Sequence, residues 1–316
     1  MTVIPRPIRT TVARHSRLAL PLALLAILLL TGATAPRSAP ALPAALPMLS
    51  PAAPPSFGLN THLATRYPDP STMDVPAALV SELGVTWARE DFHWHRVQPR
   101  PESWDWTFTD AAMRALLSRN INVLGVLGPS VGWATPFSAD TPNDVSYYAP
   151  DPDAFVAYVR GVVTRYRRYV HYWEIWNEPD SVIFWRPAPD AAAYTTLLVR
   201  VAAVIREVDP DARILIGGLN PYDTTFLRSV AEYGGWDSFD ILAIHPYVNP
   251  YSPEDGNLAA ATDGVRAIAR QYGEKPIWAT ELGWASGPSD RDSAGHTDEE
   301  AQASYLVRAL LMLWEA

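Results

Sequence analysis

The sequence contains a pair of glutamates whose surroundings suit acid–base and nucleophilic chemistry. Glu178 follows the aromatic and aliphatic segment Tyr172–Trp176 and precedes Pro179, so it is expected where a buried strand meets a loop. Apolar surroundings disfavour the charged form of a carboxyl, and a carboxyl that stays protonated near neutral pH can donate a proton. Glu281 stands near the end of a second apolar segment, Pro276–Leu282. Two carboxyls about 5–5.5 Å apart can cleave a glycosidic bond with retention of configuration.

Glu174 is a rival for the role of the acid. It lies four residues before Glu178, so at the spacing of a strand the two side chains share a face. Glu174 falls inside the predicted strand rather than at its end, which favours a residue of a buried layer. We therefore expect Glu178 to be the acid/base and Glu281 the nucleophile.

Polar residues at other predicted strand ends could support these two carboxyls. The nucleophile must stay ionised, which requires hydrogen-bond donors or a cation nearby. Arg89, His245 and Tyr247 stand at strand ends that could supply them, although Arg89 could instead pair with an adjacent acid. Asn177 could bond the 2-hydroxyl of the sugar, an interaction that strengthens in the transition state.

Further candidates for substrate binding are aromatic residues and histidines. Aromatic side chains suit stacking on sugar rings, and the candidates are Trp94, Trp133 and Trp284. His62 ends the first predicted strand and His93 follows the second, and both could also contact the sugar. No group of histidines and carboxylates has the spacing of metal ligands, and no glycine-rich phosphate-binding motif follows a strand, so we expect no metal and no cofactor.

The chain alternates strands and helices from Phe57 onward. The predicted strands, bounded only to within a few residues, are Phe57–His62, Val85–Asp91, Asn122–Gly128, Tyr172–Asn177, Arg213–Leu219, Asp240–Tyr247 and Pro276–Leu282. A final helix is expected from Thr297, with Thr297 and Glu300 forming a capping box. Regular βα units with apolar strands predict an α/β fold, a TIM (β/α)8 barrel with its active site at the carboxyl ends of the strands. The sequence stops inside the seventh helix, so the barrel is expected to be truncated after the seventh βα unit.

The N-terminal residues predict a targeting segment. Arginines precede the apolar segment Leu18–Leu30, and small residues follow it. This segment is shorter than the about 20 residues of a membrane span, which favours a signal peptide over residues 1–35, with an uncleaved membrane anchor as the alternative. Residues 36–55 are rich in Ala and Pro and predict a linker. Residues 56–316 would form the catalytic barrel, and the protein would be secreted or extracytoplasmic.

Three motifs carry a resemblance to a known group of enzymes. They are Trp-Glu-Ile-Trp-Asn-Glu-Pro (173–179), His-Pro-Tyr (245–247) and Ile-Trp-Ala-Thr-Glu-Leu-Gly-Trp (277–284). With these motifs the sequence resembles the retaining glycoside hydrolases of clan A, families 39 and 5 in particular, over about residues 57–316. The resemblance implies a β-xylosidase-like or endoglucanase-like enzyme. It also implies that Arg89 and Tyr247 support the nucleophile and that Asn177 binds the 2-hydroxyl.

The amino-acid composition excludes some kinds of binding site and disfavours some classes of partner. The formal net charge of -9 gives no support for nucleic-acid binding. The absence of cysteine excludes disulfides and thiolate metal sites. We expect a monomer whose partner is a carbohydrate and which meets a membrane only if the N-terminal segment is retained. An inactive truncated barrel that binds carbohydrate as a pseudoenzyme is the alternative function, and transglycosylation remains open beside hydrolysis.

Overall fold

Strands and helices alternate along the computed structural model, which describes residues 57–136, 145–287 and 297–315. All of these residues belong to one compact unit. The predicted signal peptide (1–35) and linker (36–55) lie outside the described residues and stay predictions. Among the helices in the described ranges, none combines the length and apolar character needed to cross a bilayer.

The strands are parallel and follow one another in sequence order. They are β1 (Gly58–Asn60), β2 (Trp87–Phe92), β3 (Asn122–Leu127), β4 (Tyr172–Ile175), β5 (Arg213–Ile216), β6 (Leu242–Ile244) and β7 (Ile277–Ala279). Strands β1 to β5 form one sheet, β6 pairs with β7, and parallel bridges from Leu215 and Leu219 join β5 to β6. A doubly wound sheet would reverse its order, whereas a βα barrel does not. The predicted α/β fold with a parallel sheet is confirmed.

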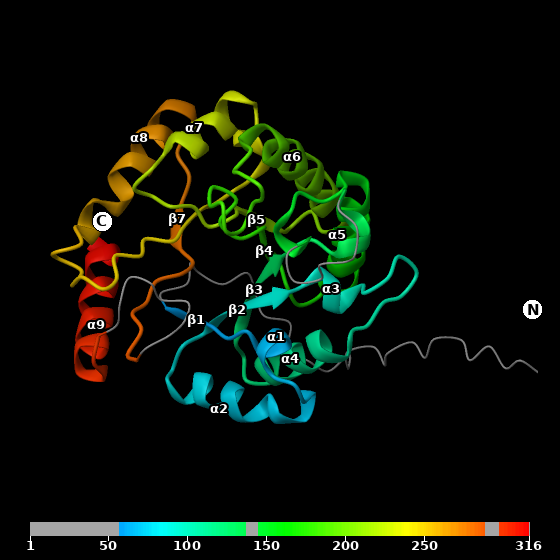
Figure 1. Ribbon diagram of the computed structural model, residues 1–316. Helices are drawn as coiled ribbons and strands as arrows, with labels where there is room; N and C mark the ends of the chain where they lie inside the picture. Colours follow the sequence, from blue (N-terminus) through cyan, green and yellow to red (C-terminus); the bar gives the residue numbers. More distant parts are fainter. Residues whose placement is uncertain (1–56, 137–144, 288–296, 316) are drawn as a thin grey trace, which may run out of the picture. The chain divides into compact units, whose positions relative to one another are not determined.

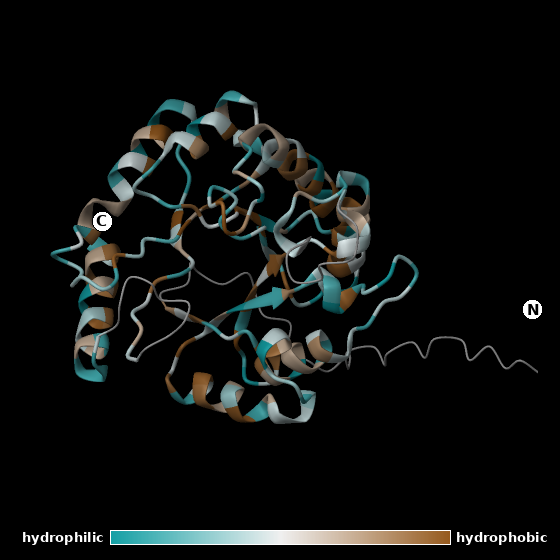
Figure 2. Cartoon of the chain, viewed as in Figure 1, coloured by the Kyte–Doolittle hydropathy of each residue, from teal (hydrophilic) through white to brown (hydrophobic). Residues whose placement is uncertain are grey.

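The longer helices lie outside the strands (Figure 1). The α-helices are α1 (Leu63–Arg66), α2 (Asp74–Glu82), α3 (Trp94–Val97), α4 (Thr107–Leu117), α5 (Pro152–Tyr166), α6 (Ala191–Val208), α7 (Thr225–Glu232), α8 (Asp263–Tyr272) and α9 (Glu299–Glu315). Short 3₁₀ turns occur at Pro70–Thr72, Gly132–Ala134, Val145–Tyr147, Trp236–Ser238 and Leu258–Thr262. Figure 2 shows hydrophilic and hydrophobic residues on the same helices, as expected for helices with one face on a core and one face in water.

Helix starts follow the capping residues in the sequence. Asp151 and Asp190 accept hydrogen bonds from the backbone three residues further on, which satisfies free N–H groups at the starts of α5 and α6. The predicted capping box of Thr297 and Glu300 is wrong. The cap of α9 is Asp298, whose Oδ1 accepts from Ala301 N at 2.7 Å. The Thr297 hydroxyl instead donates to the carbonyl of Ala285, so the helix begins two residues later than predicted.

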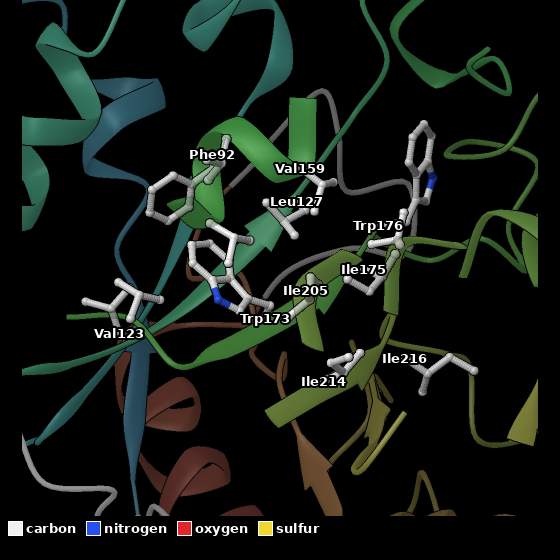
Figure 3. Packing of buried hydrophobic residues seen from close by; sticks show 14 of the residues in the cluster. Phe92, Val123, Leu127, Val159, Trp173, Ile175, Trp176, Ile205, Ile214 and Ile216 are labelled. Carbon is white, nitrogen blue, oxygen red and sulfur yellow. The ribbon is translucent and has the colours of Figure 1, made fainter. Parts of the chain in front are cut away.

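The strands alternate between two environments. One set of side chains packs between the strands and the helices, where Figure 3 shows Phe92, Trp173 and Ile175 among the buried residues. The ring centroids of Phe92 and Trp173 lie 5.2 Å apart. The other set faces the space enclosed by the strands, because successive strand residues point to opposite sides. The candidate site is built from this second set.

Candidate active site

An aromatic layer forms the floor beneath the site. Trp87 on β2, Tyr172 on β4 and Trp278 on β7 contact one another, with ring centroids 4.9 Å to 5.6 Å apart. They belong to one apolar cluster with Leu124 and Leu215 of β3 and β5. Two residues further along the same strands the layer becomes charged, with Arg89 above Trp87 and Glu174 above Tyr172. Arg89 is 6% exposed and Glu174 0% exposed, and burial of this kind strengthens the interaction between opposite charges.

Arg89 connects the residues of the site. Its Nε and Nη2 donate to the two carboxylate oxygens of Glu174, each at 2.9 Å, and both side chains are buried. Nη2 also donates to Asn177 Oδ1 at 2.9 Å, and Nη1 donates to Glu281 Oε1 at 2.5 Å. Burial alone would lower the pKa of Arg89, but the negative charges, Glu174 foremost, raise it. Arg89 therefore stays charged, and its main partner is Glu174 rather than Glu90 or Asp91.

Glu281 has several hydrogen-bond donors. Besides the bond from Arg89, the hydroxyl of Tyr247 donates to Glu281 Oε2 at 2.9 Å. Burial of the carboxyl would raise the pKa of Glu281, but the positive charges of His245 and Arg89 and the hydrogen bonds from Tyr247 and Arg89 lower it. The structure therefore keeps Glu281 ionised and oriented, as a nucleophilic carboxylate requires.

Glu178 lies in a different environment. Its Oε1 is 2.8 Å from His245 Nδ1, while His245 Nε2 is 3.1 Å from Thr280 Oγ1. His245 is hydrogen-bonded to Glu178, and its Nε2 also lies 3.9 Å from Glu281 Oε1, close enough to lower the pKa of Glu281 as expected of a cation beside that carboxyl. Glu178 has a φ of 45° and Trp176 a φ of 72°, a left-handed conformation that is costly for residues other than glycine. Such strain gathers at functional sites, where the surrounding structure holds it in place.

The two glutamates lie close together. A carboxylate oxygen of Glu178, a ring nitrogen of His245 and a carboxylate oxygen of Glu281 all lie within 4.8 Å of one another. Among the described residues these three could also offer ligands to a metal ion, although Glu281 Oε1 already accepts a hydrogen bond from Arg89. The expectation of no metal stays a prediction.

A glycine allows His245 to take its position. Gly218 N, just beyond β5, donates to Glu174 Oε1 at 3.0 Å. A Cβ at residue 218 would lie 1.9 Å from His245 Nε2, far closer than the van der Waals radii of the two atoms allow. The backbone after β5 thus holds Glu174 and leaves room for the histidine at the same point.

The other predicted polar residues gather around a different acid. His62 Nδ1 lies 2.6 Å from Asp91 Oδ2, and His93 Nε2 lies 3.7 Å from the same oxygen. Burial would raise the pKa of Asp91, but the hydrogen bond from His62 and the charges of His93, His62 and Arg89 lower it. The partner of both histidines is therefore Asp91 rather than either glutamate, and their contact with a sugar stays a prediction.

Two of the predicted sugar platforms are wrong. Trp94 is 0% exposed and stacks on Tyr158 within the core, so its ring faces cannot receive a sugar. Trp284 is 5% exposed, donates to the carbonyl of Tyr251 and packs against Tyr305. Trp133 is half-buried against Trp94, and its role stays a prediction. Large aromatics fill the ends of a barrel as readily as they line a subsite.

A cleft opens beside Glu178. It has a volume of about 750 Å³ and lies between the loops that follow β4 and β5, with His245 and Tyr247 also in its wall. Its lining includes residues to which sequence reasoning gave no role: Asp180, Ser181, Asn220, Tyr222 and Asp223. The signal was available for Asp180, a carboxylate two residues after Glu178, and for Asn220 and Tyr222, which follow a predicted strand.

Comparison with known proteins supports a glycoside hydrolase fold. No protein-family model matches the sequence. A β-xylosidase of Geobacillus stearothermophilus is 27% identical over 179 residues, 50% of this chain and 34% of that protein. A family 39 glycoside hydrolase of Bacteroides cellulosilyticus superposes with a TM-score of 0.61 and 23% identity, covering 82% of this chain and 53% of that one. A monomeric β-xylosidase of Caulobacter crescentus gives 0.60 and 23%, covering 81% and 57%.

These similarities cover only part of the length of the related proteins. The chain spans about a third of the curated relative and somewhat more than half of the two solved structures. At these identities the shared property is the fold, a parallel α/β fold of the kind found in family 39 glycoside hydrolases. The resemblance to clan A glycoside hydrolases that the sequence motifs indicate is confirmed.

Proposed function

We propose that the protein is a retaining glycoside hydrolase that cleaves β-glycosidic bonds by double displacement. The observation that carries the proposal is the pair Glu178 and Glu281, with carboxylate oxygens within 4.8 Å. Retaining glycosidases require carboxyl groups about 5–5.5 Å apart, whereas inverting enzymes leave room for a water molecule at about 6.5–9.5 Å. The short distance between these two oxygens supports a retaining rather than an inverting mechanism.

The surroundings of each carboxyl support its role. Glu281, ionised and oriented by Arg89 and Tyr247, would attack the anomeric carbon and form a glycosyl ester. Glu178 would protonate the departing oxygen and then accept a proton from the water molecule that releases the sugar. The hydrogen bond from Arg89 occupies Asn177 Oδ1 and leaves its amide N–H groups to donate to a sugar hydroxyl.

We propose a β-xyloside as the first substrate to test, because the curated relative and one solved structure are β-xylosidases. The wider substrate class is oligo- or polysaccharide with β-linkages. For the fold we propose the (β/α)8 barrel, of which the described residues supply seven strands in the barrel order. Truncation after the seventh unit stays a prediction.

The test is a panel of aryl β-glycosides, with xyloside first, read by phenol release and by proton NMR of the sugar product. We expect the β-anomer to appear first, as retention requires, and activity to vanish in Glu281→Gln. First appearance of the α-anomer, or undiminished hydrolysis by Glu281→Gln, would overturn the mechanism. Sugar binding without turnover by the intact protein would favour the pseudoenzyme alternative.

We also propose that the protein is secreted and acts as a monomer. The arginines and apolar segment of residues 1–35 support export, and the monomeric Caulobacter enzyme supports a single chain. Expression of the full chain in a bacterial host, followed by N-terminal sequencing of the extracytoplasmic protein, tests cleavage near residue 35. Light scattering of the same material measures the mass.

A further inference from the structure

The cleft beside Glu178 extends away from the proposed nucleophile. Glu178 is in its wall, whereas Glu281 is not among its lining residues. The walls come from the loops after β4 and β5, from His245 and Tyr247 after β6, and from the adjoining parts of α6 and α7. Its volume of about 750 Å³ falls within the roughly 300–1,000 Å³ of typical ligand sites.

The position of the cleft assigns the part of the substrate that occupies it. The acid must lie beside the glycosidic oxygen, which departs with the leaving group, while the nucleophile lies against the anomeric carbon of the retained sugar. Space on the side of Glu178, away from Glu281, therefore receives the leaving group. This step rests on the proposed function.

The charged side chains in the walls of the cleft are mainly acidic. The lining carries the carboxylates of Glu178, Asp180 and Asp223 and neither lysine nor arginine. Hydrogen bonds from the side chain and backbone of Thr225 lower the pKa of Asp223. Burial raises the pKa of Asp180 to about 6, so it too is mostly ionised at pH 7 and above. Its Oδ2 accepts from Asn220 N at 2.8 Å, which holds the carboxylate in the wall.

An aromatic ring stands in the same wall. Tyr222 is 45% exposed and lines the cleft next in sequence to Asp223. An exposed aromatic face beside carboxylates is favourable for an ammonium group, which gains from the π-system and from the opposite charges. The same wall disfavours a carboxylate, because the lining has three carboxylates and, besides them, only His245 as a group that can carry positive charge.

We propose that this cleft is a leaving-group subsite that selects groups carrying a protonated amine, such as an amino sugar, over groups carrying a carboxylate, such as a uronic acid. Asp180 and Asp223 supply the charge, and Tyr222 supplies the stacking face. These three residues are binding residues that set specificity and take no part in bond cleavage.

The first measurement compares leaving groups on the sugar that the enzyme hydrolyses best. The matched aglycones are 4-(aminomethyl)phenol, 4-(hydroxymethyl)phenol and 4-(carboxymethyl)phenol, which are similar in size. We expect kcat/KM at pH 7.5 and low salt to be about tenfold higher for the amine than for the carboxylate, an effect that added salt weakens. In Asp180→Asn/Asp223→Asn the ratio should fall to within about threefold. The use of a ratio cancels any general loss of activity.

A control variant and a second measurement distinguish a failure of the subsite from a failure of the proposed function. Asp153→Asn/Asp211→Asn removes the same charge at exposed positions outside the cleft and should leave the ratio as in the wild type. Independently of turnover, NMR titration of glucosamine, glucose and glucuronate should rank their Kd values with glucosamine tightest. That ranking should be lost in Asp180→Asn/Asp223→Asn.

The outcomes are distinct. A ratio near one in the wild type, or a ratio unchanged in the double variant, overturns the subsite while leaving hydrolysis intact. If no glycoside is hydrolysed, the proposed function fails and the leaving-group assignment fails with it. The titration then tests the selectivity of the cleft alone: an aspartate-dependent preference for glucosamine supports that selectivity, and equal binding of the three sugars overturns it. Should the double variant fail to fold by circular dichroism, Asp223→Asn alone, at an exposed position, gives the same comparison with a smaller change.

Discussion

The two glutamates of the site lie in contrasting surroundings. Glu281 receives hydrogen bonds from a buried arginine and a tyrosine, and its pKa is lowered. Glu178 contacts one histidine, takes a left-handed backbone conformation and borders an open cleft. One carboxyl is held ionised by the hydrogen bonds it accepts, and the other borders the space that a substrate could enter. This contrast between the two environments supports the proposed roles, Glu281 as the nucleophile and Glu178 as the acid/base.

The largest effect is expected when the two contrasting carboxyls are themselves replaced. Glu281→Gln should lower kcat about ten-thousandfold or more for every aryl glycoside, because no other group can form the ester. Glu178→Gln should lower kcat/KM, which reports formation of the ester, as strongly for poor leaving groups but far less for dinitrophenyl glycosides, which depart without a proton. Steady-state kinetics across phenols of different acidity measure this difference. The exposed Glu207→Gln serves as control, and equal losses for all phenols in Glu178→Gln would contradict the assignment.

The next largest effect is expected when the cation of the site, Arg89, is removed. Arg89 contacts Glu174, Asn177 and Glu281. Arg89→Met leaves Glu174 fully buried without its ion pair, which should cost about 3–5 kcal/mol of unfolding free energy. Urea denaturation followed by fluorescence measures the loss. Arg89→Met/Glu174→Met, which removes both charges, should recover much of it. No recovery in the double variant would show that the pair is not the reason for the loss.

A smaller effect tests how Glu281 is kept ionised. The hydroxyl of Tyr247 lowers the pKa of Glu281, so Tyr247→Phe should raise that pKa and reduce kcat/KM about tenfold. The nucleophile must be ionised, so activity is lost as pH falls through its pKa, and the acid limb of the pH profile should move to higher pH. Profiles of kcat/KM for wild type and variant measure the shift. The exposed Tyr233→Phe is the matched control, and an unmoved acid limb would contradict the prediction.

The smallest effect concerns the partner of Glu178. Thr280→Val removes the hydroxyl 3.1 Å from His245 Nε2, which should weaken the positioning of the histidine and lower kcat a fewfold. Thr280→Ser keeps the hydroxyl and should behave like the wild type. The comparison uses kcat with a poor leaving group, where protonation matters most. Equal losses in both variants would point to packing instead.

Local sequence patterns predicted the parallel α/β fold and placed Glu178 and Glu281 at strand ends that the structure brings together. Apolar segments ending in polar residues located the strands, and the carboxyl ends of parallel strands had to meet. The same patterns could not show which side chains pair across the space that the strands enclose. The pairing of Arg89 with Glu174 joins residues 85 positions apart, and the burial of Trp94 depends on contacts with α5. The environment of a tryptophan is set by the packing of several elements, which no local pattern contains.

The cleft was missed for a related reason. Its walls combine the loops after β4 and β5, and each loop alone contains only ordinary polar residues. Asp180 lies in the loop that carries Glu178, yet its place beside Asn220 N depends on how the two loops meet. The capping residue of α9 was misassigned by one position, because Thr297 and Asp298 are both good caps and the bond from Thr297 to Ala285 decides between them.

The backbone at Gly218 has a consequence for how this chain can vary. Any side chain there would occupy the space of the His245 imidazole while the amide still holds Glu174. In a library that samples every residue at each position, residue 218 should therefore tolerate replacement as poorly as the glutamates, although it contributes no functional group. Paired libraries at 218 and 245 should regain folded members only where the histidine has become small, and those members should fold without turning over substrate.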